Sequence, residues 1–331
     1  MKKSDVPLVS VGIPVYNGEK TIDKILNSIL GQSYKNIEII ISDNNSSDRT
    51  YEICNLYMKK DQRIKLYKQN INIGVAKNFN FVFKKSTGKY FMWAAVDDIF
   101  DNNFILLNLN NLEKNPQAVL SQAKTKLFVD GYDEIIALSS LKSFKNKKSI
   151  LSLYKESLYN FPATAIYGLY RSEKLKKTSL WRNTFSGDLI LIQEMCFYGD
   201  FIEVNEECYF NYISRKEWKT KKEDYFDFYN ENNIPFLYSP FFKIIYFHIL
   251  NIKKSNLRII SKFYLYLIIL NYVIYKFFVR LLLKFNKYFV PNKLKIKFGV
   301  FIYNFFILNK NIEIIKNDIY FKRFIIPQIF N

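Results

Sequence analysis

The chain has 331 residues, of which 49% are hydrophobic and 24% charged, which excludes a wholly disordered protein and allows a substantial core. The three cysteines, Cys54, Cys196 and Cys208, form no CxxC pair, which excludes zinc-finger spacing and a disulfide framework and indicates free thiols in a reducing cytoplasm. The net charge of +19 is uneven, because residues 241–331 hold 16 Lys or Arg against two acidic residues, a net of +14. Two regions with different tasks are therefore expected.

The first 120 residues alternate between short apolar runs and amphipathic stretches. Apolar runs predict buried strands at residues 8–15, 37–41, 64–67 and 90–94. Helical spacing predicts helices at residues 21–30, from about residue 48 or 50 onward, and at 75–87, the last ended by Gly88. This order predicts an α/β fold, with a Rossmann-like, mostly parallel sheet, helices on both faces and ligands at the carboxyl ends of the strands.

The second half is less regular. Residues 124–150 are expected to form a hairpin that turns at Asp130-Gly131 and leads into a Lys/Ser-rich loop. Residues 151–240 show a mixed pattern, and a basic, aromatic tail begins at about Phe241.

Polar clusters follow three of the predicted strands. They are Pro14 to Asn17, residues 42–48, and the adjacent acids Asp97 and Asp98. Two neighbouring carboxylates at the end of a buried strand repel each other and lose hydration. Both effects cost free energy, and a nearby cation offsets this cost. A hard divalent ion held by carboxylate and diphosphate oxygens provides that compensation. Taken alone, however, the pair fits a helix cap better than an ion site.

The ordered set of motifs resembles that of the family 2 glycosyltransferases of the GT-A fold. The set comprises Val-Ser-Val-Gly-Ile-Pro-Val-Tyr-Asn-Gly-Glu, Ser-Asp-Asn-Asn-Ser-Ser-Asp-Arg-Thr, Asn-x-Gly-x-Ala-x-Asn, Gly-Lys-Tyr and Asp-Asp, spread over roughly residues 8–120. The resemblance implies an inverting, metal-dependent transferase that uses a nucleotide diphosphate sugar, most often a UDP-sugar. It also implies a GT-A domain over residues 1–240, with a donor half at about 1–120 and an acceptor half at about 121–240.

The resemblance implies a role for each matching residue of the donor half. Asp43 would hydrogen-bond the base, Asp97 would contact the ribose or the ion, and Asp98 would ligate Mg²⁺ or Mn²⁺. The remaining donor-binding positions, along the base, ribose and diphosphate, are Pro14, Tyr16, Asn17 and Lys77. Ala95 stands where many members carry a further Asp, which weakens the expectation of metal dependence.

An inverting transfer also needs a carboxylate that takes the proton of the acceptor hydroxyl. His248 is the only histidine and lies in the tail, so we expect it to be a packing or surface residue. Asp188, in Ser-Gly-Asp-Leu, resembles the family's Glu-Asp or Gly-Asp at the start of the helix under the acceptor site, which implies that Asp188 is the base; the alternative is a helix N-cap. Glu194 is the fallback base, and Arg171 is given either an acceptor-binding or a structural task.

The tail, residues 241–331, contains a long apolar stretch interrupted by basic residues. Six of them fall within an arc of about 80° on a helix, namely Arg258, Lys262, Lys276, Arg280, Lys284 and Lys287. The longest uncharged run, Phe263 to Tyr275, has 13 residues, whereas a spanning helix needs about 20. This pattern favours a helix at an anionic membrane surface; the alternative is a core helix whose single wet face is basic.

The family resemblance implies a bacterial hexosyl- or N-acetylhexosaminyl-transferase of polysaccharide biosynthesis. Its acceptor would be a glycan or a lipid-linked glycan, and it would lie in the cytoplasm, peripherally on the inner face of the cell membrane. No nucleic-acid motif is visible, so we expect no nucleic-acid partner. The alternative is a non-catalytic glycan-assembly partner with a degenerate fold, supported by the absence of an acid at Ala95.

Overall fold

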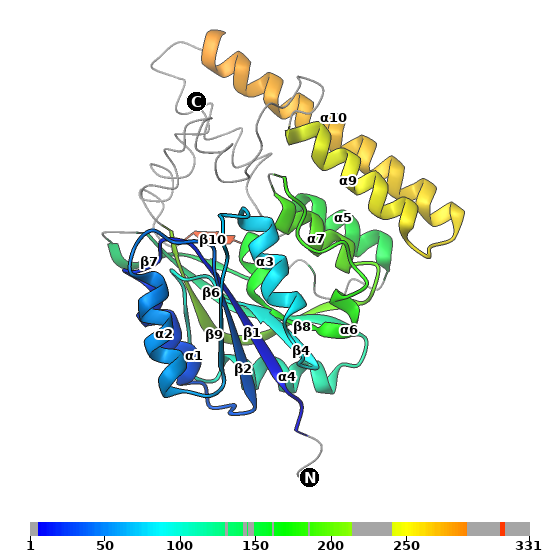
Figure 1. The fold of residues 1–331 in the computed structure, drawn as a ribbon. Helices are drawn as coiled ribbons and strands as arrows, with labels where there is room; N and C mark the ends of the chain where they lie inside the picture. The colour runs from blue at the N-terminus through cyan, green and yellow to red at the C-terminus, as the bar shows by residue number, and fades with distance from the viewer. Residues whose placement is uncertain are drawn as a thin grey trace.

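The computed structural model of the chain describes residues 6–129, 132–141, 144, 149–160, 162–184, 186–213, 240–289 and 312–314. Its amino-terminal half alternates strands and helices as predicted (Figure 1). The strands are β1 (Val9–Val15), β2 (Ile37–Asp43), β3 (Ile64–Lys68) and β4 (Tyr90–Trp93), and the helices between them are α1 (Ile22–Leu30), α2 (Thr50–Lys60) and α3 (Val75–Lys84). The four strands pair in parallel in the order β4-β1-β2-β3.

Alternate residues of the central strands point into two cores on opposite faces of the sheet, as the period of a strand requires. Ile39 of β2 packs with α1 and with α4 (Phe104–Lys114) on one face. The next residue, Ile40, packs with α3 on the other face, and so do Phe91 and Trp93 of β4. Helices on both faces explain why every residue of β1, β2 and β4 is buried.

The second half of the chain makes the sheet mixed. Its strands are β5 (Ile99–Phe100), β6 (Ala118–Val129), β7 (Tyr132–Ser139), β8 (Leu169–Arg171), β9 (Asp200–Ile213) and β10 (Ile312–Ile314). β8 joins β4 to β6 through two antiparallel pairings, and β9 runs parallel to β6 and antiparallel to β5. The predicted hairpin is confirmed, because β6 and β7 are antiparallel with Val129 opposite Tyr132; the turn at residues 130–131 lies outside the described residues.

Helices cover one side of this half. They are α5 (Ile150–Asn160), the 3₁₀ helix η2 (Ala163–Tyr167), α6 (Ser172–Leu175), α7 (Gly187–Met195), α9 (Pro240–Lys254) and α10 (Ile259–Phe289). Figure 1 shows α9 and α10 side by side along the outer side of α5 and α7. Ile252 of α9 and Leu265 and Ile269 of α10 belong to the same core as α3. This core therefore contains residues from both sides of the boundary predicted at residue 240. The division of the chain into a GT-A domain and a separate tail stays a prediction.

The outward side of α9 and α10 is apolar. These helices carry sixteen of the 21 exposed large hydrophobic side chains of the described residues. On α10 they are Ile259, Ile260, Phe263, Tyr264, Leu267, Leu270, Ile274, Phe277, Phe278, Leu281, Phe285, Tyr288 and Phe289, and we call this set the apolar face. One helix of the described chain, at Ile259–Asn286, is long and apolar enough to cross a membrane by length and composition alone.

Candidate active site

The predicted site loops meet at the carboxyl edge of the parallel strands. Val15 lies opposite Asp43, so β1 and β2 end at the same level, whereas β4 ends at Trp93 opposite Gly12, three residues before the end of β1. A side-chain carbon built on Gly18, after β1, would lie 3.7 Å from the Val96 side chain, after β4. The first and fourth loops are therefore neighbours, as the switch in strand order at β1 requires.

Hydrogen bonds join the loop after β1 to the loop after β2. The backbone N–H of Asn17 donates to Ser46 Oγ at 2.9 Å, and the N–H of Ser47 donates to Asn17 Oδ1 at 2.9 Å. Asn17 adopts a positive φ of 51°, a conformation that Asn tolerates better than most residues. The Gly18 N–H donates to Thr50 Oγ1 at 2.8 Å. The two loops thus form one unit at the predicted nucleotide position.

The predicted nucleotide-binding residues differ in accessibility. Pro14 and Asp43 are buried at the ends of β1 and β2, whereas Tyr16 is 50% exposed. The Asp43 carboxylate accepts a hydrogen bond from the Ser46 N–H at 3.3 Å and so closes the loop that contains Asn45, another residue with positive φ. Asp43 therefore has a structural task in the loop in addition to the base contact predicted for it.

Three asparagines shape the third loop; sequence analysis placed all three within the family motifs but assigned none of them a role. Asn44 Oδ1 accepts from the Ile73 N–H at 2.9 Å, and Asn72 Oδ1 accepts from the Gly74 N–H at 2.9 Å. Asn78 is buried, and its amide donates to the Ser42 carbonyl at 3.1 Å. These bonds fix the start of α3.

Lys77 lies in the first turn of α3 and is exposed. Its position at the carboxyl edge leaves the ammonium accessible to an anionic ligand.

The two adjacent acids after β4 have different surroundings. Asp97 is partly exposed, whereas Asp98 is 1% exposed. Both carboxylate oxygens of Asp98 accept hydrogen bonds from β9: the Tyr209 hydroxyl donates to Oδ2, Asn211 Nδ2 donates to Oδ1 at 2.8 Å, and the Tyr212 N–H donates to Oδ1 at 3.3 Å. Burial, followed by the adjacent Asp97, raises the pKa of Asp98 well above its usual value, against the effect of these three donors.

No group of three or more His, Cys, Asp or Glu side chains that could hold a metal ion lies within the described ranges. An ion at the acids would therefore need further oxygen ligands from the donor. The adjacent carboxylates of Asp97 and Asp98, beside the loop unit at the strand ends, fit an ion that arrives with a diphosphate, because a cation would offset the repulsion by which Asp97 helps to raise the pKa of Asp98. The assignment of Asp98 as its ligand stays a prediction.

Asp188 lies in the first turn of α7, after Ser186. The helix begins at Gly187, so Asp188 is not its N-cap, and the structure does not favour the capping alternative. Burial raises the pKa of Asp188 to about 6, and the backbone N–H groups of Leu189 and of Asp188 itself lower it only in part. The Asp188 charge also contributes to the raised pKa of Tyr170, whose ring packs against Trp93 at a centroid distance of 5.6 Å. Asp188 is thus near enough to Tyr170 for the two groups to interact electrostatically.

The other second-half candidates have structural partners. Glu194 is buried, and its carboxylate accepts from the Ser179 N–H at 2.9 Å, which ties α7 to the loop before it. His248 is a packing residue, as expected: it is buried in α9, its Nδ1 lies 3.1 Å from the Tyr154 hydroxyl, and burial lowers its pKa to about 4. Arg171 donates to the carbonyls of Ala118 and Leu112 at 2.8 and 2.6 Å. Of its two predicted tasks, acceptor binding and a structural one, these contacts support the structural one.

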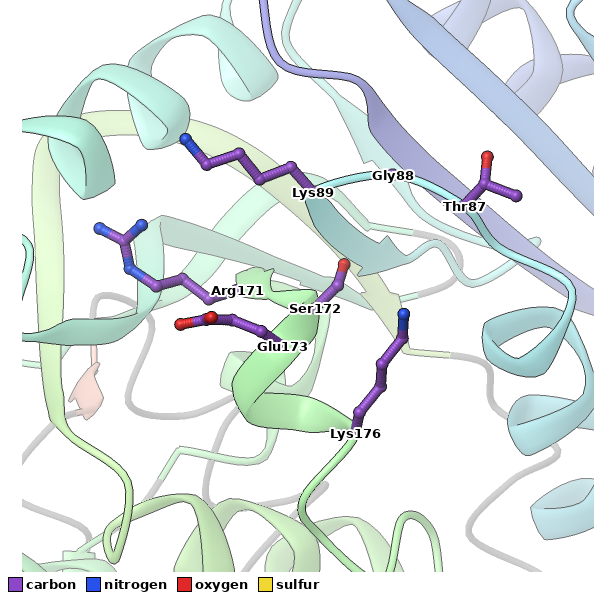
Figure 2. A pocket seen from close by; sticks show the side chains of 7 residues that line it. All are labelled: Thr87, Gly88, Lys89, Arg171, Ser172, Glu173 and Lys176. Carbon is purple, nitrogen blue, oxygen red and sulfur yellow. The ribbon is translucent and has the colours of Figure 1, made fainter.

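A hollow of about 400 Å³ lies at the opposite, amino-terminal end of β4. It is lined by Thr87, Gly88, Lys89, Arg171, Ser172, Glu173 and Lys176, shown in Figure 2. Lys89 and Arg171 extend away from Lys176 in this view, and Lys89 pairs with Glu113 at 2.9 Å. This hollow is separate from the predicted donor site.

The chain is similar to known glycosyltransferases. Residues 10–174 match the sequence model of glycosyl transferase family 2. An uncharacterized glycosyltransferase of Haemophilus influenzae is 37% identical over 111 residues, covering 34% of this chain and 44% of that protein. Glycosyltransferase GlyG of Streptococcus pneumoniae is 30% identical over 151 residues, covering 43% of this chain and 50% of GlyG. The similarity thus spans half or less of these relatives' lengths.

Solved structures share the fold. S. aureus TarS 1-349 in complex with UDP has a TM-score of 0.60 at 16% identity, covering 87% of this chain and 77% of that one. The mannosyltransferase PcManGT of Pyrobaculum calidifontis, in complex with GDP-Man and Mn²⁺, has a TM-score of 0.50 at 14% identity, covering 79% and 74%.

The mixed sheet, with polar loops at the ends of its parallel strands, defines an α/β protein of the GT-A class. The chain belongs to family 2 of the glycosyl transferases.

Proposed function

We propose that the chain transfers one sugar from a nucleotide diphosphate sugar to an acceptor hydroxyl, with inversion at the anomeric carbon. The donor we propose is a UDP-sugar. The observation that carries the proposal is the meeting of the loops after β1, β2 and β4 beside the partly exposed Asp97. The complexes of TarS with UDP and UDP-GlcNAc and of PcManGT with GDP-Man support this class of donor.

In this proposal the loop unit after β1 and β2 binds the nucleotide. Asp43 accepts the imide proton of uracil, and Pro14, Tyr16 and Asn17 contact the base and ribose. Lys77 contacts the base or the diphosphate from the start of α3, where its exposed ammonium supports the assignment.

The acid pair would hold Mg²⁺ or Mn²⁺ together with diphosphate oxygens. The family resemblance implies that Asp98 is the ligand and that Asp97 contacts the ribose or the ion. A bound ion of this kind neutralises charge on the departing diphosphate. The Mn²⁺ complex of PcManGT supports a divalent ion in this fold class.

Asp188 would act as the base. Its carboxylate takes the acceptor proton while the acceptor oxygen forms a bond to the anomeric carbon and the bond to the diphosphate breaks. A pKa of about 6 suits this task, because the group is largely ionised at neutral pH yet remains a stronger base than an ordinary Asp.

We further propose that the acceptor is a glycan or a lipid-linked glycan and that the chain lies on the cytoplasmic, anionic surface of the cell membrane through its tail. Residues 240–289 contain nine Lys or Arg and no acidic residue, and the apolar face of α10 is exposed beside them. Arg258 and Lys284 are exposed and Lys262 and Lys276 partly so; the side chains of Arg280 and Lys287 lie outside the described set. An apolar face bordered by cations suits insertion into an anionic interface.

The rival function is a non-catalytic partner in glycan assembly. Ala95 in place of an acid supports it. It predicts nucleotide-sugar binding without turnover.

The deciding experiment is a panel of UDP-, GDP- and CDP-sugars, measured for thermal stabilisation with and without Mn²⁺ and then for donor hydrolysis. A bound donor stabilises the fold by mass action, so the right donor should raise the melting temperature above the others, and more with Mn²⁺. Stabilisation without hydrolysis, with every donor and a glycan acceptor present, would favour the non-catalytic partner. Stabilisation by no donor would overturn both readings.

A further inference from the structure

The two acids after β4 belong to a short loop, Ala94–Asp98, which we call the acidic loop. Its first residue is held by the sheet, because the Ala94 N–H donates to the Gly12 carbonyl at 2.9 Å. Its last residue closes a turn, with the Asp98 N–H donating to the Ala95 carbonyl at 3.3 Å. Neither bond fixes the side chains that would meet a diphosphate.

The third attachment of the acidic loop comes from β9. Tyr209 and Asn211 are two residues apart on this strand, so both side chains face the same side of the sheet. Together with the Tyr212 N–H they donate to both oxygens of Asp98. We call these three donors the clasp. A buried carboxylate that accepts three hydrogen bonds is held in one orientation, because each bond restricts both its position and its rotation.

The Tyr209 side chain is itself held in place. Its ring is fully buried and stacks on Phe100 at a centroid distance of 4.7 Å and an interplanar angle of 9°. Phe100 lies opposite Tyr209 in the β5–β9 pairing, and the Asp101 N–H donates to the Cys208 carbonyl at 2.9 Å. Backbone pairing and ring stacking therefore fix the hydroxyl before any ligand arrives.

We infer that Tyr209 and Asn211 are positioning residues: they hold the acidic loop through Asp98, so that the partly exposed Asp97 is presented to the ion and the diphosphate. Asp98 then acts as an anchor whose carboxylate is already bound by the protein, and Asp97 takes the role of ion ligand that the family resemblance implies for Asp98. The inference rests on the proposed function for its ligand, and on the clasp geometry alone for its structural part.

The structural part is tested by amide hydrogen exchange of the acidic loop in the free enzyme, with neither metal nor nucleotide. Tyr209→Phe removes only the donating hydroxyl, and Asn211→Ala removes the amide. Each should speed exchange in residues 94–98 by about tenfold or more, the size of effect expected when a buried hydrogen-bonding group loses its partner. Tyr198→Phe is the matched control, because its hydroxyl donates at 2.9 Å to the Lys177 carbonyl, away from the acids.

The ligand part is tested by titrating Mn²⁺ into the complex with UDP. Asp97→Asn should abolish Mn²⁺ binding. Tyr209→Phe and Asp98→Asn should raise the half-saturating Mn²⁺ concentration by about fivefold or more while binding still saturates, with little additional loss in the double variant, because both changes act through one contact.

Two results would overturn the inference. In one, Tyr209→Phe leaves exchange of the acidic loop unchanged, or speeds exchange equally throughout the protein. In the other, Asp98→Asn abolishes Mn²⁺ binding as completely as Asp97→Asn while Tyr209→Phe has no effect. A wild-type enzyme that binds no Mn²⁺ with UDP but shows the expected exchange would instead contradict the metal in the proposed function and confirm the clasp.

Discussion

Asp188 is the residue whose titration should be visible in the reaction. Because its pKa is about 6, the carboxyl keeps its proton below that pH and cannot act as a base. We expect kcat/KM to fall about tenfold per pH unit below about pH 6 and to level off above it. Asp188→Asn should lower kcat by roughly 100-fold or more, with donor binding unchanged. It should also remove the fall in kcat/KM below about pH 6, which we call the acid limb of the pH profile.

Glu194→Gln is the control for this experiment, because Glu194 is the other carboxylate of α7 and has partners in the fold. It should retain the acid limb. If the fall in kcat/KM below about pH 6 persists in Asp188→Asn and disappears in Glu194→Gln, Glu194 is the base.

Asp43 should decide between nucleotide bases. Asp43→Asn keeps one oxygen for the Ser46 N–H but places an amide donor against the imide N–H of uracil. UDP binding, measured by calorimetry, should weaken by about 1–3 kcal/mol, the usual cost of an unpaired polar group. CDP binding should change less, because cytosine has no imide proton. Equal affinity of the wild type for UDP and CDP would contradict the base contact.

At the scale of elements, Glu38 joins four segments at the amino-terminal edge of the sheet. Its buried carboxylate in β2 accepts from Ser10 Oγ of β1 at 2.6 Å, from Lys65 Nζ of β3 at 2.7 Å, and from the N–H of Thr87, before β4, at 2.6 Å. These donors outweigh burial and lower the pKa of Glu38 from 4.5 to about 2.

A carboxyl whose pKa is lower in the folded state stabilises the fold above its unfolded pKa and loses that effect as pH falls. Glu38→Gln should therefore lower the free energy of unfolding by about 3 kcal/mol at pH 7, and the difference from wild type should shrink between about pH 4.5 and pH 2. Urea unfolding at pH 7 and pH 3 measures this. Glu52→Gln removes an exposed ion pair with Arg49 and should change stability by less than about 0.5 kcal/mol; an equal effect of the two substitutions would refute the role of Glu38.

The elements differ in how far sequence could predict them. β1 to β4 were predictable because each is an apolar run followed by a polar loop, and the family motifs lie in those loops. β8 and β9 were not, because residues 151–240 have no clear period and the antiparallel pairings of β8 depend on distant strands. Asp98 was recognisable as a site residue, but its partner Tyr209 lies 111 positions away, and no local spacing indicates such a contact.

For the whole molecule, the tail prediction concerns attachment to a surface. Reversing Lys276, Arg280 and Lys284 to Glu should release the protein from anionic liposomes at low salt, because each cation contributes about 1 kcal/mol of attraction. Wild-type binding should weaken as salt rises. Hydrolysis of a soluble donor should be unaffected, since these residues lie outside the strand-end loops.

The matched control reverses three exposed lysines of α2 and α3, namely Lys59, Lys60 and Lys84. It should sediment with anionic liposomes like the wild type. If the wild-type protein does not sediment with anionic liposomes at low salt, the alternative is supported: α10 is then a core helix, and its apolar face packs against protein and not against lipid.

The contact between Asp98 and β9 also bears on the order in which the protein matures during synthesis. The first four strands are complete at Trp93, and the segment that matches the family model ends at residue 174, yet the clasp needs residues 209–212. A chain emerges from the ribosome with its amino terminus first. The parallel strands of the donor half can therefore pair while the acidic loop still lacks the hydrogen bonds of the clasp. The proposed donor site is thus completed by one of the last strands of the described sheet to be made, and a chain terminated before β9 would keep the parallel core but lose the clasp.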